Sequence, residues 1–310
     1  MELSNKNPFI PPQTKKTFIF SVINCFIALI KLPFMLFAFL ISFSYAILST
    51  FIPINTLKRI VIHSTSSVLF RIMLGFTGIY SVNKQPTPLI DTFSNIGELH
   101  EPQPGDIIIS NFASYLNIFW LQNEYSPIFA IPINENDVYV FNAFQLLTLI
   151  FSSKKITSKV KVSLNDLIKS ARNKYQCPIV IFPESVPTNG QFIINFQPFG
   201  KNIDEKNLNL IHFHIFGFIH FNSSISPNFT FGNIVLHLLS MVGRIVSGLK
   251  VKIALQQDIP LIKNQSIDDE YIEKCRQIMS SITGLPTFDA GCEEFEKVKN
   301  YVMKKKQHND

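Results

Sequence analysis

Three polar side chains with chemistry to offer follow an apolar run in the first half of the chain. Asn111, Ser114 and Asn117 come after Ile107–Ile109, a run that predicts a buried β-strand ending in a turn. Strands of α/β proteins commonly deliver polar groups at their carboxyl ends, where binding and catalytic sites are built. The stretch Asp106–Asn117 is therefore the first candidate site.

A second apolar run, Ile179–Phe182, also predicts a buried strand that ends in polar residues. Glu184 follows it, and the turn after Glu184 contains Ser185, Thr188, Asn189 and Gly190. Turns of this composition present backbone N–H groups and hydroxyls to anions, although Asn-Gly is also an ordinary turn signal. An anion-binding loop and a plain turn are both compatible with these residues.

Three histidines lie within the apolar stretch Leu208–Phe221, which we interpret as a strand. His212, His214 and His220 have the same parity, so on a regular strand they share one face. They could act as a base, bind a metal, or simply be polar rings on a partly exposed or membrane-facing strand. A zinc site needs further ligands, and no cysteine or acidic partner recurs nearby, so we expect no metal site.

The overall composition limits the class of protein. Hydrophobic residues make up 46% of the 310 residues and charged residues 16%, which is too apolar for a disordered chain. The net charge of +6 suits an anionic partner such as a phosphorylated ligand or a membrane. Nucleic acid is not expected, because the basic residues are scattered. The four cysteines show no pairing or metal spacing, which is typical of a reducing compartment.

The amino-terminal part predicts a membrane anchor. A flexible polar arm, residues 1–17, precedes a mainly apolar stretch of 35 residues, Phe18–Ile52, which has one charge, Lys31. Lys31-Leu-Pro33 divides this stretch into Phe18–Ile30 and Phe34–Ile52. Because basic residues flank both ends, and such flanks favour the cytosol, we expect a helical hairpin over residues 18–55. Two full spans, one span, and a helix buried in a soluble core are the alternatives. A signal peptide is not expected, because the stretch is too long.

The rest of the chain predicts an α/β fold. Residues 56–80 read as an amphipathic linker helix, either on the membrane surface or packed as an ordinary helix. Strands and helices then alternate through residues 81–300, which indicates a mixed, largely parallel sheet flanked by helices. We expect strands at Ile79–Val82, Ile107–Ser110, Ile128–Ile131, Lys159–Val162, Pro178–Phe182, Leu208–Phe221 and Lys250–Leu255, and helices from Ser114, at Tyr139–Ile150, from Ser163 to Asn173, at His237–Ser247 and at Asp268–Ile282. A basic tail, residues 301–310, ends the chain.

Together, the two candidate segments resemble a known pair of motifs. Asn111-Phe-Ala-Ser-Tyr-Leu-Asn117 is similar to the Asn-His-x-Ser-x-x-Asp block of the glycerophospholipid acyltransferase superfamily, and Phe182-Pro-Glu-Ser-Val186 to its Phe-Pro-Glu-Gly-Thr block. The chain most resembles the fungal lysophosphatidic acid acyltransferases that use oleoyl-CoA. It shares their early Pro-Phe-(Ile/Leu)-Pro, here Pro8–Pro11, and their later Asn-Gly, here Asn189-Gly190. The amino-terminal apolar anchor and the basic tail agree with this layout.

The resemblance implies a glycerolipid acyltransferase-like fold and acyl transfer from acyl-CoA to a lysophospholipid hydroxyl. In that family the histidine of the first block is the general base and the aspartate orients it; here Phe112 and Asn117 occupy those positions. Phenylalanine cannot accept a proton, and asparagine can orient a group but carries no charge. By position, Asn117 and Ser114 are the remains of the catalytic block. The residues expected to bind substrate are Asn111, Glu184, Ser185, Thr188, Asn189 and Gly190.

A missing base raises the question of a substitute. General bases typically contribute about 100- to 10,000-fold in rate. His212 and His214 are the candidates for a substitute base, from the face that they share with His220. We expect no metal and no cofactor beyond acyl-CoA as co-substrate.

The sequence thus predicts a membrane-bound acyl-CoA-dependent acyltransferase that acylates lysophosphatidic acid or a related lysophospholipid. Its partners would be membrane lipids, the lysophospholipid and acyl-CoA, with no nucleic acid and with protein partners left open. The domain would face the cytosol from the endoplasmic reticulum membrane or a lipid droplet. The alternative is a catalytically inactive relative that binds lipid or a protein partner at the same membranes.

Overall fold

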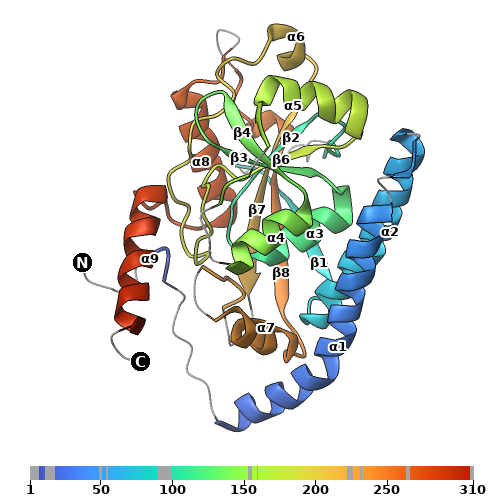
Figure 1. The fold of residues 1–310 in the computed structure, drawn as a ribbon. Helices are drawn as coiled ribbons and strands as arrows, with labels where there is room; N and C mark the ends of the chain where they lie inside the picture. The colour runs from blue at the N-terminus through green and yellow to red at the C-terminus, as the bar shows by residue number, and fades with distance from the viewer. Residues whose placement is uncertain are drawn as a thin grey trace.

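A mixed eight-stranded sheet forms the centre of the molecule (Figure 1). The computed structural model describes residues 7–10, 18–48, 51–53, 55–89, 99–152, 156–158, 160–221, 226–230, 233–262 and 266–307. The strands are β1 (Val82–Thr87), β2 (Ile107–Ser110), β3 (Ile128–Pro132), β4 (Asp137–Phe141), β5 (Lys161–Ser163), β6 (Ile179–Ile181), β7 (Phe213–Phe221) and β8 (Gly248–Ala254). The expected carboxyl-terminal basic tail is reached only in part, because residues 308–310 lie outside the described residues.

The strand order is β1-β8-β7-β2-β6-β3-β4-β5. The pairs β1–β8, β7–β2, β2–β6 and β6–β3 are parallel, whereas β8–β7, β3–β4 and β4–β5 are antiparallel. The predicted α/β class with a mixed, mostly parallel sheet is confirmed. Because β2, β6 and β7 are neighbours and parallel, the segments that follow β2 and β6 meet at one edge of the sheet.

Helices cover both faces of the sheet (Figure 1). They are α1 (Phe18–Leu48), α2 (Asn55–Phe76), α3 (Tyr115–Tyr125), α4 (Ala143–Ser152), α5 (Leu164–Ser170), which continues as a π-turn over Ala171–Tyr175, α6 (Glu205–Leu208), α7 (Ile234–Val242), α8 (Asp269–Thr283) and α9 (Cys292–Gln307), with a 3₁₀ turn at Gln256–Asp258. Side chains alternate along β2. Ile108 packs into the core below α3, and Ile107 and Ile109 pack into the core below α8.

Local sequence signals place several helix ends. Ser114 is the N-cap of α3 and accepts a hydrogen bond from Leu116 N, while Asp268 caps α8 by accepting from Tyr271 N at 2.7 Å. The expected helix over Tyr139–Ile150 is wrong in its first part. Residues 137–141 form β4 against β3, and Asn142 then starts α4 in a reciprocal cap with Gln145.

The first strand also lies later than expected, because β1 begins at Val82 and contains Pro86. Proline cannot donate to a ladder, but β1 is an edge strand with a neighbour on one side only, so this position tolerates it.

The amino-terminal apolar segment is one helix, and the predicted hairpin break at Lys31-Leu-Pro33 is wrong. The 31-residue helix α1 runs through Pro33, and the chain turns back only after Leu48 to form α2 beside it (Figure 1). Lys31 lies within this helix and not in a turn. Its Nζ donates to Arg244 O at 2.7 Å. Within the described residues, Val22–Tyr45 is the one helical stretch long and apolar enough to cross a membrane.

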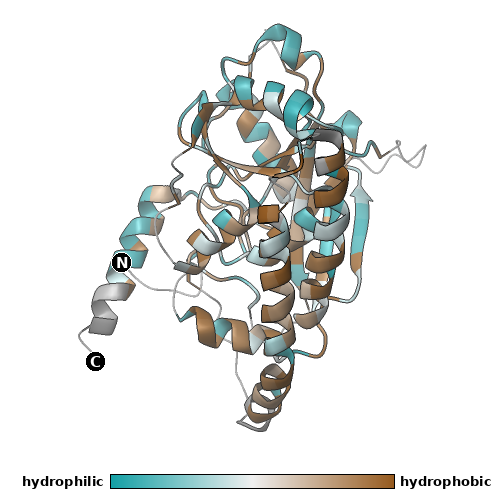
Figure 2. Ribbon diagram, turned by 45° about the vertical axis from the view of Figure 1, so that its right-hand side comes forward, coloured by the Kyte–Doolittle hydropathy of each residue, from teal (hydrophilic) through white to brown (hydrophobic). Residues whose placement is uncertain are grey.

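One face of α1 is packed against the domain. Asn24, Ala28, Met35, Ala38 and Ser42 are buried against neighbouring elements, chiefly α2 and α7. The opposite face carries exposed apolar side chains, and both α1 and α7 are strongly hydrophobic (Figure 2). The helix is therefore amphipathic in its packing although almost every residue in it is apolar.

The predicted linker helix over residues 56–80 is confirmed as α2. Phe70 and Met73 pack into the core below α3, as an ordinary packing helix would. Ile60 and Val68 point outward and are 58% and 60% exposed. The packing interpretation therefore holds for one face of α2, and the membrane-surface interpretation stays a prediction for its exposed face.

Candidate functional site

The two motif segments meet at the carboxyl ends of β2 and β6, and Glu184 joins them. Its Oε2 accepts a hydrogen bond from Phe112 N at 2.5 Å, and its Oε1 accepts one from Ile194 N at 3.1 Å. The carboxyl group is fully buried. Burial raises the pKa of Glu184 to about 7, although these two N–H donors and the charge of Arg276 act to lower it. Both oxygens are thus engaged with the protein's own backbone.

Asn111 extends the sheet beyond the end of β2. Its Nδ2 donates to Phe218 O at 3.1 Å and its Oδ1 accepts from Phe218 N at 2.8 Å, so the side-chain amide takes the place of a strand residue. Ser114 caps α3, and its hydroxyl donates to Pro227 O at 2.8 Å. Two of the expected ligand-holding residues therefore have structural partners.

Asn117 is buried and holds an imidazole. Its Nδ2 donates to Asn111 O at 3.2 Å, and its Oδ1 lies 2.9 Å from His220 Nε2. Since the amide oxygen can only accept, we assign the proton to Nε2, which leaves the lone pair on Nδ1. Burial, helped by the charge of Arg244, lowers the pKa of His220 to about 3, so the ring is neutral at pH 7. An oriented neutral imidazole is what a general base requires.

Phe112 stands where the motif that this segment resembles has its base, and it is part of an aromatic stack. Its ring lies on Phe182 with a centroid distance of 4.5 Å and an interplanar angle of 17°. Phe182 lies parallel to Phe129, with centroids 6.0 Å apart. All three rings are buried, so apolar packing replaces chemistry at this position.

His212 and His214, which were predicted as a substitute base, lie far from Asn117 and Phe112. The structure therefore does not place them where a substitute base would act. They meet Asp106 at the amino end of β2: His212 N donates to Asp106 Oδ1 at 2.9 Å, and His214 Nε2 lies 3.4 Å from Asp106 Oδ2. Six residues of strand separate His214 from His220, which corresponds to about 20 Å. Sequence parity identified the shared strand, but it could not tell which histidine reaches the candidate site.

The loop after Glu184 binds the amino terminus of the same chain. Asn189 N donates to Pro8 O at 2.7 Å, and Asn189 Nδ2 donates to Asn7 O and to Ile10 O, each at 3.0 Å. Phe9 is buried between this loop and α9. Residues 7–10, which include the first three residues of the Pro-Phe-Ile-Pro motif, thus fill the side of the loop that was expected to bind substrate, a contact no local pattern indicates.

Other residues of the loop have backbone roles. Thr188 N donates to Phe112 O at 2.9 Å, and Ser185 Oγ donates to Pro132 O at 3.4 Å. Gly190 has a φ of +70°, and a Cβ there would lie 2.2 Å from Asn228 Nδ2, so only glycine fits.

A cavity of ≈ 520 Å³ opens beside the loop. Ser185, Val186 and Pro187 form one wall, and the ends of β3 and β4 together with α4 and α9 form the others. Most of the wall is apolar, which suits a hydrocarbon chain better than a phosphate. Within the part of the chain that the structure describes, no group of three or more His, Cys, Asp and Glu side chains could hold a metal ion.

These elements define the class of protein as an α/β domain with a mixed sheet and one long apolar helix near the amino terminus. No family model, no curated protein and no solved structure matches the chain. The similarity to glycerophospholipid acyltransferases therefore stays a prediction that rests on the motif segments and their layout.

Proposed function

We propose that the protein is a membrane-associated acyltransferase that transfers an acyl group from acyl-CoA to the hydroxyl of lysophosphatidic acid or a related lysophospholipid. The observation that carries the proposal is the His220–Asn117 pair, because Asn117 occupies the position of the orienting residue in the resemblance and His220 of β7 brings an imidazole to it. An imidazole held by an asparagine amide is a known arrangement for activating a nucleophile, as in papain-like proteases.

The proposed reaction uses the free nitrogen of His220. Nδ1 takes the proton of the lysophospholipid hydroxyl as that oxygen attacks the thioester carbonyl. The carbon–sulfur bond of the tetrahedral intermediate then breaks, and the proton passes from the imidazole to the leaving CoA thiolate. Because the pKa of His220 is about 3, the ring is a weak base. It therefore accelerates the reaction less than a base with a pKa near neutrality would. We therefore expect a slow enzyme.

The apolar cavity next to Ser185–Pro187 would hold the acyl chain, and α1 would keep the protein at a membrane where both substrates are found. The positive net charge favours anionic lipids and the phosphates of CoA. The endoplasmic reticulum membrane and the lipid droplet surface, with the domain facing the cytosol, are the proposed locations.

The test is turnover by the purified full-length protein in phosphatidylcholine nanodiscs. Release of free CoA from oleoyl-CoA is followed with lysophosphatidic acid, with other lysophospholipids, and without acceptor. The proposal expects acceptor-dependent release together with a diacyl product identified by mass spectrometry. Absence of the diacyl product with every acceptor would overturn it.

A second candidate is a non-catalytic relative that binds lipid or a protein partner. It is favoured by the Phe112–Phe182 stack and by the use of Glu184, Asn189 and Asn111 in backbone hydrogen bonds. This protein would show saturable binding of lysophosphatidic acid with no product. The same nanodisc preparation distinguishes the two candidates when binding and turnover are measured in parallel.

A further inference from the structure

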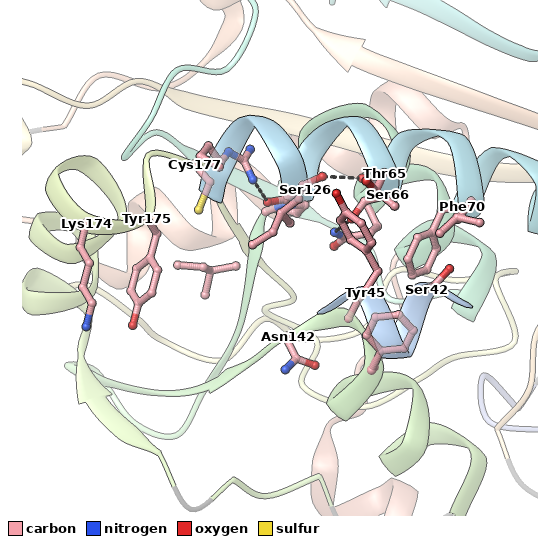
Figure 3. A pocket seen from close by; sticks show the side chains of 18 residues that line it. Ser42, Tyr45, Thr65, Ser66, Phe70, Ser126, Asn142, Lys174, Tyr175 and Cys177 are labelled. Carbon is pink, nitrogen blue, oxygen red and sulfur yellow. Dashed lines mark hydrogen bonds between the residues drawn. The ribbon is translucent and has the colours of Figure 1, made fainter. Parts of the chain in front are cut away.

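A second cavity, of ≈ 290 Å³, lies between α1, α2 and the start of α4 (Figure 3). Ser126 and Pro127, which follow α3, form part of its wall, whereas Asn117 lies in the first turn of the same helix. At 1.5 Å per residue, the length of α3 corresponds to about 16 Å. The cavity is therefore separate from the candidate acyltransferase site.

The lining of this cavity is positively charged. It includes Arg59 and Lys174, and no Asp or Glu is among the described residues that line it. The Arg59 guanidinium donates to Ser126 O at 2.7 Å and also to Tyr125 O, at the end of α3. A helix C-terminus carries only about half an elementary negative charge, so the single charge of Arg59 more than balances it. A net positive potential remains for a ligand.

The start of α4 adds to this potential. Asn142, the capping residue, and Ala143, the first residue of the helix, both line the cavity. The helix dipole favours anions at such an end, although Asn142 Oδ1 already accepts from Gln145 N. Two side-chain charges and one helix terminus therefore act in the same direction.

The lining is also divided along its length. Lys174 and Tyr175, which are exposed to water, lie on one side of the cavity, whereas Ser42 of α1 and Phe70 of α2 lie on the other, with Tyr45 of α1 nearby (Figure 3). Phe70 also contacts Phe144, with ring centroids 5.6 Å apart, and Phe144 in turn packs on α1. The cavity therefore has an exposed cationic end, and a second end next to α1 that combines aromatic rings with hydroxyl groups.

We propose that this cavity binds an anionic amphiphile with a single alkyl chain, such as a fatty acid or a single-chain phosphate lipid. The anionic group lies near Lys174 and Arg59, and the chain points toward Phe70 and α1. A carboxylate and a phosphate share the chemistry that the cavity recognises. The site does not depend on acyl transfer, so it holds for a catalytic and for a non-catalytic protein.

The test measures equilibrium binding of radiolabelled dodecyl phosphate, which has no hydroxyl to acylate, to the full-length protein in phosphatidylcholine nanodiscs. Lys174→Glu is expected to raise the Kd about tenfold, because it reverses a charge at the proposed anion position. Thr65→Phe fills the cavity and is expected to abolish saturable binding. Lys206→Glu makes the same charge change at an exposed position outside the cavity lining and should leave the Kd unchanged.

Competition separates the parts of the ligand. Unlabelled dodecyl phosphate and laurate should displace the label, whereas inorganic phosphate and dodecyl maltoside at equal concentration should not. Displacement by inorganic phosphate would show a plain anion site, and displacement by dodecyl maltoside a plain apolar site; either overturns the proposal. So does binding that Lys174→Glu leaves unchanged, since that lysine is exposed and its replacement does not disturb the core.

Discussion

Two histidines on β7 make pairs that differ in the partner's charge. Near the amino end, His214 faces the Asp106 carboxylate, and near the carboxyl end, His220 faces the Asn117 amide. A carboxylate stabilises an imidazolium, whereas an amide only orients the ring. The chain therefore keeps its His–Asp pair away from the proposed chemistry and has a neutral pair at the site. The imidazole at the proposed site is thus oriented by an uncharged partner, whereas that of His214 faces a carboxylate.

The largest expected effect concerns the two rings themselves. His220→Ala should lower the acyl transfer rate by about 100- to 10,000-fold, because it removes the proposed base. His214→Ala is the matched control, and it should leave the rate of the folded enzyme unchanged. Turnover is measured in nanodiscs, with thermal melting of each variant to normalise for folded protein. Equal losses in both variants would show that the two pairs do not differ in function.

The buried carboxyl groups of Glu184 and Asp106 should make the free energy of unfolding depend on pH with opposite signs. The folded pKa of Glu184 is about 7 against an ordinary 4.5, so between these values the folded protein binds more protons than the unfolded chain. The free energy of unfolding should therefore fall as the pH rises from about 4.5 to about 7, by on the order of 3 kcal/mol.

Glu184→Gln should remove most of this slope, because glutamine does not titrate. Denaturant titrations at several pH values measure it. The prediction fails if the stability of the wild-type protein does not fall relative to that of the variant over this interval.

Signals that are local in sequence correctly predicted the structural elements around the candidate site. The three isoleucines of β2 and the capping Ser114 are where the sequence indicates, because strand propensity and capping act over a few residues. Glu184 near Phe112 also followed from the topology, since both come after neighbouring parallel strands. The sequence did not predict that burial raises the pKa of Glu184.

Contacts between distant residues were not predictable in the same way. His220 meets Asn117 across 103 residues, and Asn189 binds Asn7 across 182. Both depend on strand register and on which segment fills the space beside the loop, and no periodicity carries that information. The anchor was predicted to break at Pro33 because proline often ends or kinks a helix. In the structure α1 continues through Pro33 and packs on α2 and α7.

Asp106→Asn should affect stability without affecting turnover. Burial acts to raise the pKa of Asp106, but hydrogen bonds from His214, His212 N and Gln103 N together lower it below its ordinary value of 3.8. Its stabilisation is therefore present above pH 3.8 and is lost as the pH falls through the folded pKa. The variant should be about 2 kcal/mol less stable at pH 7 and should lose less on acidification. A lower turnover per folded molecule would contradict the separation of the two pairs.

Asn117→Asp is the sharpest test of the comparison, because it gives His220 the kind of partner that His214 already has. A carboxylate at this position should raise the pKa of His220 toward neutrality and increase the rate at pH 7 by about tenfold. It also removes the donor to Asn111 O, so we expect a loss of about 1 kcal/mol in stability. The pH–rate profile is the measurement, and its acidic limb should move to higher pH. If the limb stays in place while stability falls, the imidazole does not take the substrate proton, and the pair at Asn117 is a structural contact only.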